Sequence, residues 1–175
     1  KKNFFISIFF QDIDLLNQNI EILNNLIEYK KLLPKEEFEN FDLTIHIRHL
    51  YKNKNIDENE MYKNQPNIFF YKKIIDKENP KNIKIVCSNK NNEVLLSLKN
   101  IYGNKINFFE TDDISDFTSL LYSKKIILSL STFSLWSAIL SKAEKVYVPN
   151  SGILKKILKS KILDINSKFN YIDYQ

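Results

Sequence analysis

Short apolar runs alternate along this chain with longer segments in which apolar residues recur every three or four positions. The short runs predict strands, and they cover residues 4–10, 43–48, 83–87, 106–109, 125–128 and 145–148. The periodic segments predict helices over residues 12–33, 67–77, 91–101, 115–122, 133–141 and 151–159. A polar loop separates the second strand from the second helix, and the tail to residue 175 fits neither pattern.

The regular alternation of strands and helices predicts an α/β fold, a Rossmann-like parallel sheet with helices on both faces. The length suits a single domain over residues 1–175. Ligands of such sheets bind at the carboxyl ends of the strands, where the strand order reverses. Polar side chains directly after a strand are therefore the first candidates for a functional site.

Composition removes several classes of protein. The chain has 2 glycines, 4 prolines and 1 cysteine, which excludes a collagen-like or linker-rich protein and a disulfide framework. No apolar run approaches the roughly 18–20 residues of a membrane helix, and we expect a cytoplasmic location. The net charge of +5 comes from lysines scattered among acidic residues, so nucleic acid is not the expected partner.

Both histidines and the single arginine lie within four consecutive residues, at the end of the predicted 43–48 strand. Alternation along the strand places His46 and Arg48 on one face, so that both can reach one ligand. An arginine in a chain rich in lysine suggests bidentate binding of a phosphate or carboxylate by a planar guanidinium. The alternative is a partly buried histidine beside an arginine paired with an acidic residue.

A second group of polar residues runs from the end of the 125–128 strand into the next helix. It contains four hydroxyl side chains, those of Ser129, Ser131, Thr132 and Ser134. The only tryptophan, Trp136, follows them. Free N–H groups at a helix start, together with short hydroxyls, can bind an anion without glycine. The alternative is an ordinary helix cap. Trp136 itself could lie in the core or wall a ligand pocket.

A third group follows the strands at 83–87 and 106–109. Ser88 and Asn89 come directly after the first of these strands, and Asp116 lies in the helix after the second, with Asp113 or Ser115 as candidate cap. A carboxylate pairs well with the N1–H and N2–H groups of guanine. Acidic residues are also common in the first turn of any helix, so this alternative stays open.

Several familiar motifs are absent from the sequence, namely GxxxxGK[ST], GxGxxG and HExxH. The two histidines lie three residues apart with no third ligand evident, so we predict no metal site. Cys87 is interpreted as a small buried thiol rather than a nucleophile.

Taken in order, these segments resemble the α-1,2-fucosyltransferase family, glycosyltransferase family 11. Residues 4–12 (FFISIFFQD) resemble its FxGYFQ segment, residues 44–49 (TIHIRH) its HxRRGDY strand, and residues 85–89 (IVCSN) a strand ending F-S/C-D/E-D. Residues 116–121 (DFTSLL) resemble its D-x-x-x-M helix, and residues 145–149 (KVYVP) its KIIIxP strand. The most specific likeness is between residues 127–138 (ILSLSTFSLWSA) and IIANSTFSWWAA.

The resemblance implies one half of a GT-B-like enzyme that transfers fucose from GDP-fucose to a glycan hydroxyl with inversion, without a metal. It implies a nucleotide-sugar donor and a glycan acceptor as partners, and contact with a membrane only through the acceptor. By this resemblance Arg48 and His46 are the catalytic residues: Arg48 binds the β-phosphate and supports its departure, and His46 faces the guanine and ribose. Asp116 holds the guanine edge. The remaining donor-binding residues implied are Ser88, Asn89, Ser131, Thr132, Phe133 and Ser134.

The chain departs from the family pattern in two places. His49, Leu50 and Tyr51 stand where the family has Arg, Gly and Asp, and nothing resembles the family's GGLGNQ opening. These departures suit the donor-binding half of a longer protein, or a chain that needs a partner for its acceptor site. Two alternatives stay open: a GT-B half that uses another nucleotide sugar, and a non-catalytic nucleotide-sugar-binding or scaffolding module.

Overall fold

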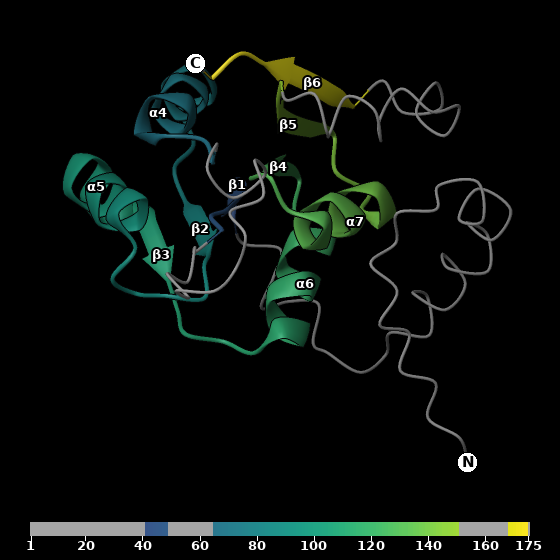
Figure 1. Cartoon of the computed structure of the whole chain (residues 1–175), viewed down its shortest axis with the longest axis horizontal. Helices are drawn as coiled ribbons and strands as arrows, with labels where there is room; N and C mark the ends of the chain where they lie inside the picture. The colour runs from purple at the N-terminus through teal and green to yellow at the C-terminus, as the bar shows by residue number, and fades with distance from the viewer. Residues whose placement is uncertain (1–40, 49–64, 151–167, 175) are drawn as a thin grey trace, which may run out of the picture.

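The computed structural model describes residues 41–48, 65–150 and 168–174, in which strands alternate with helices (Figure 1). The strands are β1 (Leu43–His46), β2 (Ile83–Val86), β3 (Ile106–Phe108), β4 (Lys125–Ile127), β5 (Lys145–Pro149) and β6 (Phe169–Ile172). The helices are α4 (Ile68–Glu78), α5 (Glu93–Tyr102), α6 (Asp113–Leu121) and α7 (Thr132–Leu140), with a short 3-10 turn, η2 (Gly103–Lys105). The strand predicted at 4–10 and the helices predicted at 12–33 and 151–159 lie outside the described residues.

The six strands form one sheet in the order β3-β2-β1-β4-β5-β6, and every neighbouring pair is parallel. The first three strands extend the sheet in one direction from β1, and the last three extend it in the other direction from β4. The strand order therefore reverses between β1 and β4. The predicted α/β fold with a parallel sheet is confirmed.

Helices cover both faces of this sheet, with α4 and α5 on one side and α6 and α7 on the other (Figure 1). Each pair of helices buries its own core. The core under α4 and α5 includes Leu43, Ile45, Phe70, Tyr71, Ile85 and Leu98. The core under α6 and α7 includes Val86, Leu120, Leu128, Leu135, Trp136 and Val146. Both faces of the central strands β1 and β2 are buried, which explains why the sequence shows them as dense apolar runs.

Local capping explains where the first two described helices begin and end. The side chain of Asn67 accepts hydrogen bonds from the N–H groups of Phe69 (3.0 Å) and Phe70 (3.3 Å), which starts α4. Asn79 ends α4 in the left-handed conformation (φ 43°), directly before Pro80. Asn92 caps α5 through the N–H groups of the next turn.

Three details differ from the sequence prediction. Asp112, rather than Asp113 or Ser115, caps α6, because its carboxylate accepts a hydrogen bond from the Ser115 N–H at 2.7 Å. Strand β1 ends at His46 instead of residue 48, although the N–H of residue 47 still donates to Val86 O at 2.9 Å. The tail also forms a strand, β6, which its half-exposed residues did not signal because only its pairing with β5 defines it.

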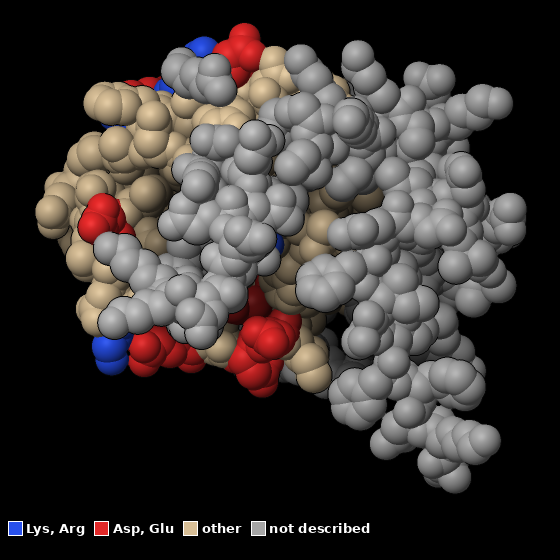
Figure 2. All heavy atoms as spheres, viewed as in Figure 1, with Lys and Arg blue, Asp and Glu red and all other residues tan. Residues whose placement is uncertain are grey.

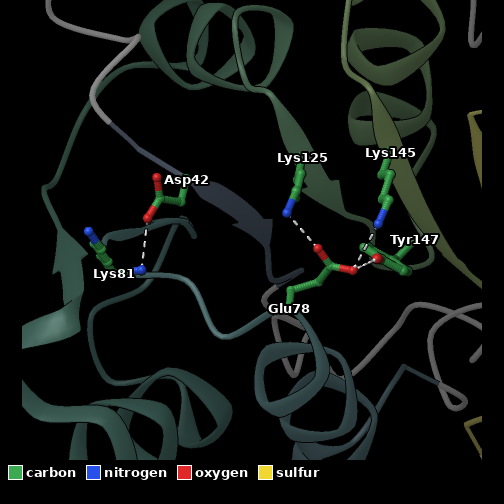
Figure 3. Close-up of polar contacts among 6 residues, drawn as sticks. All are labelled: Asp42, Glu78, Lys81, Lys125, Lys145 and Tyr147. Atoms are coloured by element: carbon green, nitrogen blue, oxygen red, sulfur yellow. Dashed lines mark hydrogen bonds and ion pairs between the residues drawn. The ribbon is translucent and has the colours of Figure 1, made fainter.

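A buried carboxylate ties α4 to β4 and β5 (Figure 3). The side chain of Glu78 is 6% exposed and accepts hydrogen bonds from Lys125 Nζ at 2.6 Å, Lys145 Nζ at 3.3 Å and the Tyr147 hydroxyl. Burial alone would raise the pKa of Glu78, but these hydrogen bonds outweigh it and lower the pKa to about 2. Lys125 and Lys145 begin their strands, so this cluster lies at the edge opposite the carboxyl ends.

Replacing Glu78 with glutamine should destabilise the fold by roughly 2 kcal/mol at neutral pH, because charge-assisted hydrogen bonds are lost. The folded-state pKa is depressed, so this stabilisation is present above the ordinary value of 4.5 and is lost as the pH falls toward 2. Urea unfolding at pH 7 and at pH 3 should show a smaller difference between wild type and variant at pH 3. The control is Glu110→Gln, which removes an exposed pair with Lys90 and should change stability little. Equal losses at both pH values would contradict this assignment.

Candidate functional site

The carboxyl ends of β1 and β4 lie side by side in the middle of the sheet. The two strands pair in parallel, with Thr44 opposite Ile126 and Ile45 opposite Ile127. Residues that follow β1 and residues that follow β4 therefore emerge at the same edge, at the point where the strand order reverses. Two of the three polar groups found in the sequence follow these two strands.

His46 and Ser129 join these two groups directly. The imidazole Nδ1 of His46 lies 2.6 Å from the hydroxyl Oγ of Ser129, and both residues are buried. The imidazole also packs against the ring of Phe133, with 5.8 Å between ring centroids. The opposite face of β1 packs into the core under α4 and α5, so the predicted division of this strand into two faces is confirmed.

The environment of His46 keeps its imidazole neutral. Burial, and secondly the positive charge of Arg48, lowers the pKa of His46 to about 3. A group with so low a pKa is a poor proton acceptor at neutral pH, but it can hold a fixed hydrogen bond. Arg48 itself is partly exposed, two residues beyond the end of the strand.

The start of α7 is not capped by the side chain that stands there. Ser131 occupies the capping position, yet its side chain makes no capping hydrogen bond. The Ser134 hydroxyl donates to Ser131 O at 3.2 Å, which turns it back onto its own helix. Thr132 and Phe133 are partly exposed at this end. The ordinary capping alternative is therefore wrong for Ser131, and an uncapped helix start of this kind suits an anion.

Trp136 belongs to the core. It is 8% exposed and packs among the buried residues under α6 and α7. Of the two interpretations of this residue, the core position is confirmed.

The third polar group lies one strand away, after β2. Ser88 is exposed. Asn89 builds the turn before α5, since its side-chain oxygen accepts from the Asn91 N–H at 2.8 Å and its carbonyl from the Asn92 N–H at 3.1 Å. Cys87 is buried, with its thiol donating to Asn89 O at 3.5 Å, so the buried-thiol interpretation is confirmed.

Asp116 lies in the first turn of α6 and is partly buried. Its carboxylate accepts a hydrogen bond from the Thr111 hydroxyl at 2.6 Å. Burial raises its pKa, while the bond from Thr111 and the charge of Lys84 oppose that rise. The neighbouring Phe117 packs edge-on against Phe133, with 5.6 Å between ring centroids. Through these rings the start of α6 connects to the start of α7.

Acidic groups gather on the surface beside the start of α6 (Figure 2), where Glu110, Asp112 and Asp113 are exposed. In the described part of the chain, no group of three or more His, Cys, Asp or Glu side chains is placed to hold a metal ion. Within the same residues, none of the helices has the length and hydropathy needed to span a membrane.

The sequence prediction missed three residues that shape this region. Ser129 was recognised only as one hydroxyl among four, not as the partner of His46. Lys84 is buried in β2 and donates to the Ser119 hydroxyl at 2.7 Å beneath α6, which the apolar strand pattern does not reveal. Gln65 pairs with the backbone of Leu130 and comes from a polar loop that carries no local signal.

A parallel sheet in this order, with helices on both faces and polar groups at the reversal, defines a Rossmann-like α/β domain. The family model described as Glycosyl transferase family 11 matches residues 71–172, and the chain belongs to this family of glycosyltransferases. The matched region includes Asp116 and the start of α7, whereas His46 and Arg48 precede it. Comparisons with curated proteins and with solved structures find no match.

Proposed function

We propose that this glycosyltransferase domain transfers fucose from GDP-fucose to a glycan hydroxyl, forming an α-1,2 linkage with inversion and without a metal. The observation that carries the proposal is the contact between His46 and Ser129 at the reversal of the strand order. It joins the strand end that carries Arg48 to the turn that opens α7. These are the two places where the sequence offers groups for a diphosphate.

In this proposal the diphosphate lies between Arg48 and the start of α7. The guanidinium supplies a bidentate, permanently charged contact to the β-phosphate, and the N–H groups of Thr132 and Phe133 supply neutral donors. These groups stabilise the negative charge that grows on the phosphate as the bond to the sugar breaks. Ser131 and Ser134 line the same turn.

The proposed reaction is a single displacement at the anomeric carbon. The acceptor hydroxyl oxygen forms a bond to that carbon while the bond between the carbon and the β-phosphate oxygen breaks. The electron pair leaves with GDP, and the hydroxyl proton passes to a base on the acceptor side. A pKa of about 3 makes His46 a poor candidate for that base, which supports a role in binding the donor as a neutral imidazole.

Recognition of the base falls in this proposal to Asp116, with Ser88 and Asn89 nearby around the end of β2. The Asp116 carboxylate accepts from the N1–H and N2–H groups of guanine, a pair that uracil and cytosine lack. Its hydrogen bond with Thr111 holds the carboxylate in place.

A second candidate is a domain that takes another nucleotide sugar. The observation that favours it is at Asn89, where the side-chain oxygen is already used in the turn before α5. The residue at the corresponding position of the family segment is an acid, so part of the guanine-side pattern is missing here.

A thermal-shift panel of GDP-fucose, GDP, UDP-sugars and CMP-sugars tests the proposal. A ligand present at a hundred times its Kd stabilises a protein by about 2.7 kcal/mol, which for a chain of this size raises the Tm by about 5–10 °C. We expect this shift with GDP and GDP-fucose only. Stabilisation by UDP or CMP compounds alone would favour the second candidate. Binding of GDP-fucose without transfer or hydrolysis, in the full-length protein, would indicate a non-catalytic module.

A further inference from the structure

We propose that Gln65 is a positioning residue for the donor site, because it holds the turn that carries Ser129 and opens α7. The expected effect of Gln65 on GDP binding rests on the proposed function, whereas its expected effect on His46 does not. The Gln65 side-chain amide donates to Leu130 O at 3.0 Å and accepts from the Leu130 N–H at 3.2 Å. One side chain thus satisfies both polar groups of a single backbone residue.

Leu130 needs such a partner because of the turn in which it lies. The Ser131 N–H donates to Ser129 O at 2.9 Å, which closes a three-residue turn around Leu130. Leu130 is only 2% exposed, so an unpaired N–H or C=O there would be costly. Removing the Gln65 amide should therefore disturb the turn itself rather than merely lose two surface contacts.

Gln65 is well placed to hold the turn, because the chain after it is itself fixed. The residue before a proline is restricted to extended conformations, and Pro66 is buried. Asn67 then caps α4. The amide is therefore presented by a short rigid segment that belongs to the connection between β1 and β2.

The turn around Leu130 also sets the geometry of the site, through the residue before Leu130 and the residue after it. Ser129 provides the hydroxyl against His46 Nδ1, and Ser131 is the residue at which α7 begins. A shift of the turn would move the hydroxyl away from the imidazole and reorient the first N–H groups of α7. Gln65 acts through these groups and does not itself touch the donor in this proposal.

The test compares Gln65→Met and Gln65→Glu with wild type in two measurements. The first is GDP affinity by calorimetry, and the second is the NMR resonances of the His46 imidazole, assigned with a His49→Asn variant because the chain has only 2 histidines. Gln65→Met keeps the length and loses both hydrogen bonds. Gln65→Glu keeps the acceptor but sets a carboxylate against Leu130 O. We expect each to weaken GDP binding at least tenfold and to shift the His46 resonances.

The control is Glu78→Gln, which weakens the cluster with Lys125 and Lys145 at the opposite edge of the sheet. It should lower the Tm while leaving GDP affinity and the His46 resonances unchanged. Unchanged His46 resonances in a folded Gln65 variant would overturn the inference, as would equal effects from Glu78→Gln. If wild type binds no GDP, the proposed function fails, and the His46 resonances alone decide the role of Gln65.

Discussion

Replacing Arg48 with alanine should lower the affinity for GDP at least a hundredfold while leaving the fold intact. A bidentate, charge-assisted pair with a phosphate contributes about 3 kcal/mol, which corresponds to a hundredfold or more in Kd. Arg48 is partly exposed beyond the end of β1, so its loss leaves no cavity in either core. Calorimetry with GDP measures the affinity, and thermal unfolding measures the fold.

Two further variants separate charge from geometry. Arg48→Lys keeps the positive charge but loses the planar fork, so it should recover only part of the affinity. Lys73→Ala removes an exposed positive charge on α4 and should have no effect on GDP binding. Unchanged GDP affinity in Arg48→Ala would end the proposal that this strand end binds the diphosphate.

The stability of the protein should fall as the pH drops from about 6.5 toward 3, and His46→Asn should remove a large part of that fall. The folded-state pKa of His46 is depressed from 6.5 to about 3, so the unfolded chain binds the proton first as the pH is lowered. The contribution of His46 to the free energy of unfolding is therefore complete above pH 6.5 and is lost progressively below it, by roughly 1 kcal/mol per pH unit. Asparagine does not titrate, and its amide can reach Ser129 from a position near that of Nδ1.

Urea unfolding at several pH values checks this prediction through the slope of stability against pH. The relevant quantity is the difference in slope between wild type and variant, since His46→Asn also changes packing at every pH. His49→Asn, which removes the other histidine, is the comparison variant. A slope that survives His46→Asn and disappears in His49→Asn would show that the buried imidazole is not the titrating group.

Two groups of polar residues lie at opposite edges of the sheet, and the proposed function uses only one of them. The cluster around the Glu78 carboxylate lies at the amino ends of β4 and β5, where it ties a helix to the sheet. The His46–Ser129 pair lies at the carboxyl ends, beside a partly exposed arginine. In a parallel sheet both edges need their polar groups satisfied, but ligands of such sheets bind at the carboxyl edge, where the strand order reverses.

Within the described residues, the sequence alone was sufficient for strands β1 to β5, helices α4 to α7 and the class of fold. Strands buried on both faces read as dense apolar runs, and helices read as a period of three to four, because each of these signals is local. The ends of α4 and α5 are also set locally, and the predicted ranges 67–77 and 91–101 lie within two residues of the observed helices. The division of β1 into two faces followed from simple alternation, which is why His46 and Arg48 could be assigned together.

Only the tertiary structure decided which of these groups meet. Strand order depends on crossover connections that no local pattern records, and it is this order that sets β1 beside β4 and His46 against Ser129. Gln65 lies 65 residues from Leu130 in sequence, and Lys84 lies 35 from Ser119, so both partners are invisible to periodicity. The shift in the pKa of His46 has the same origin, because burial is a property of the packed molecule and not of the residue.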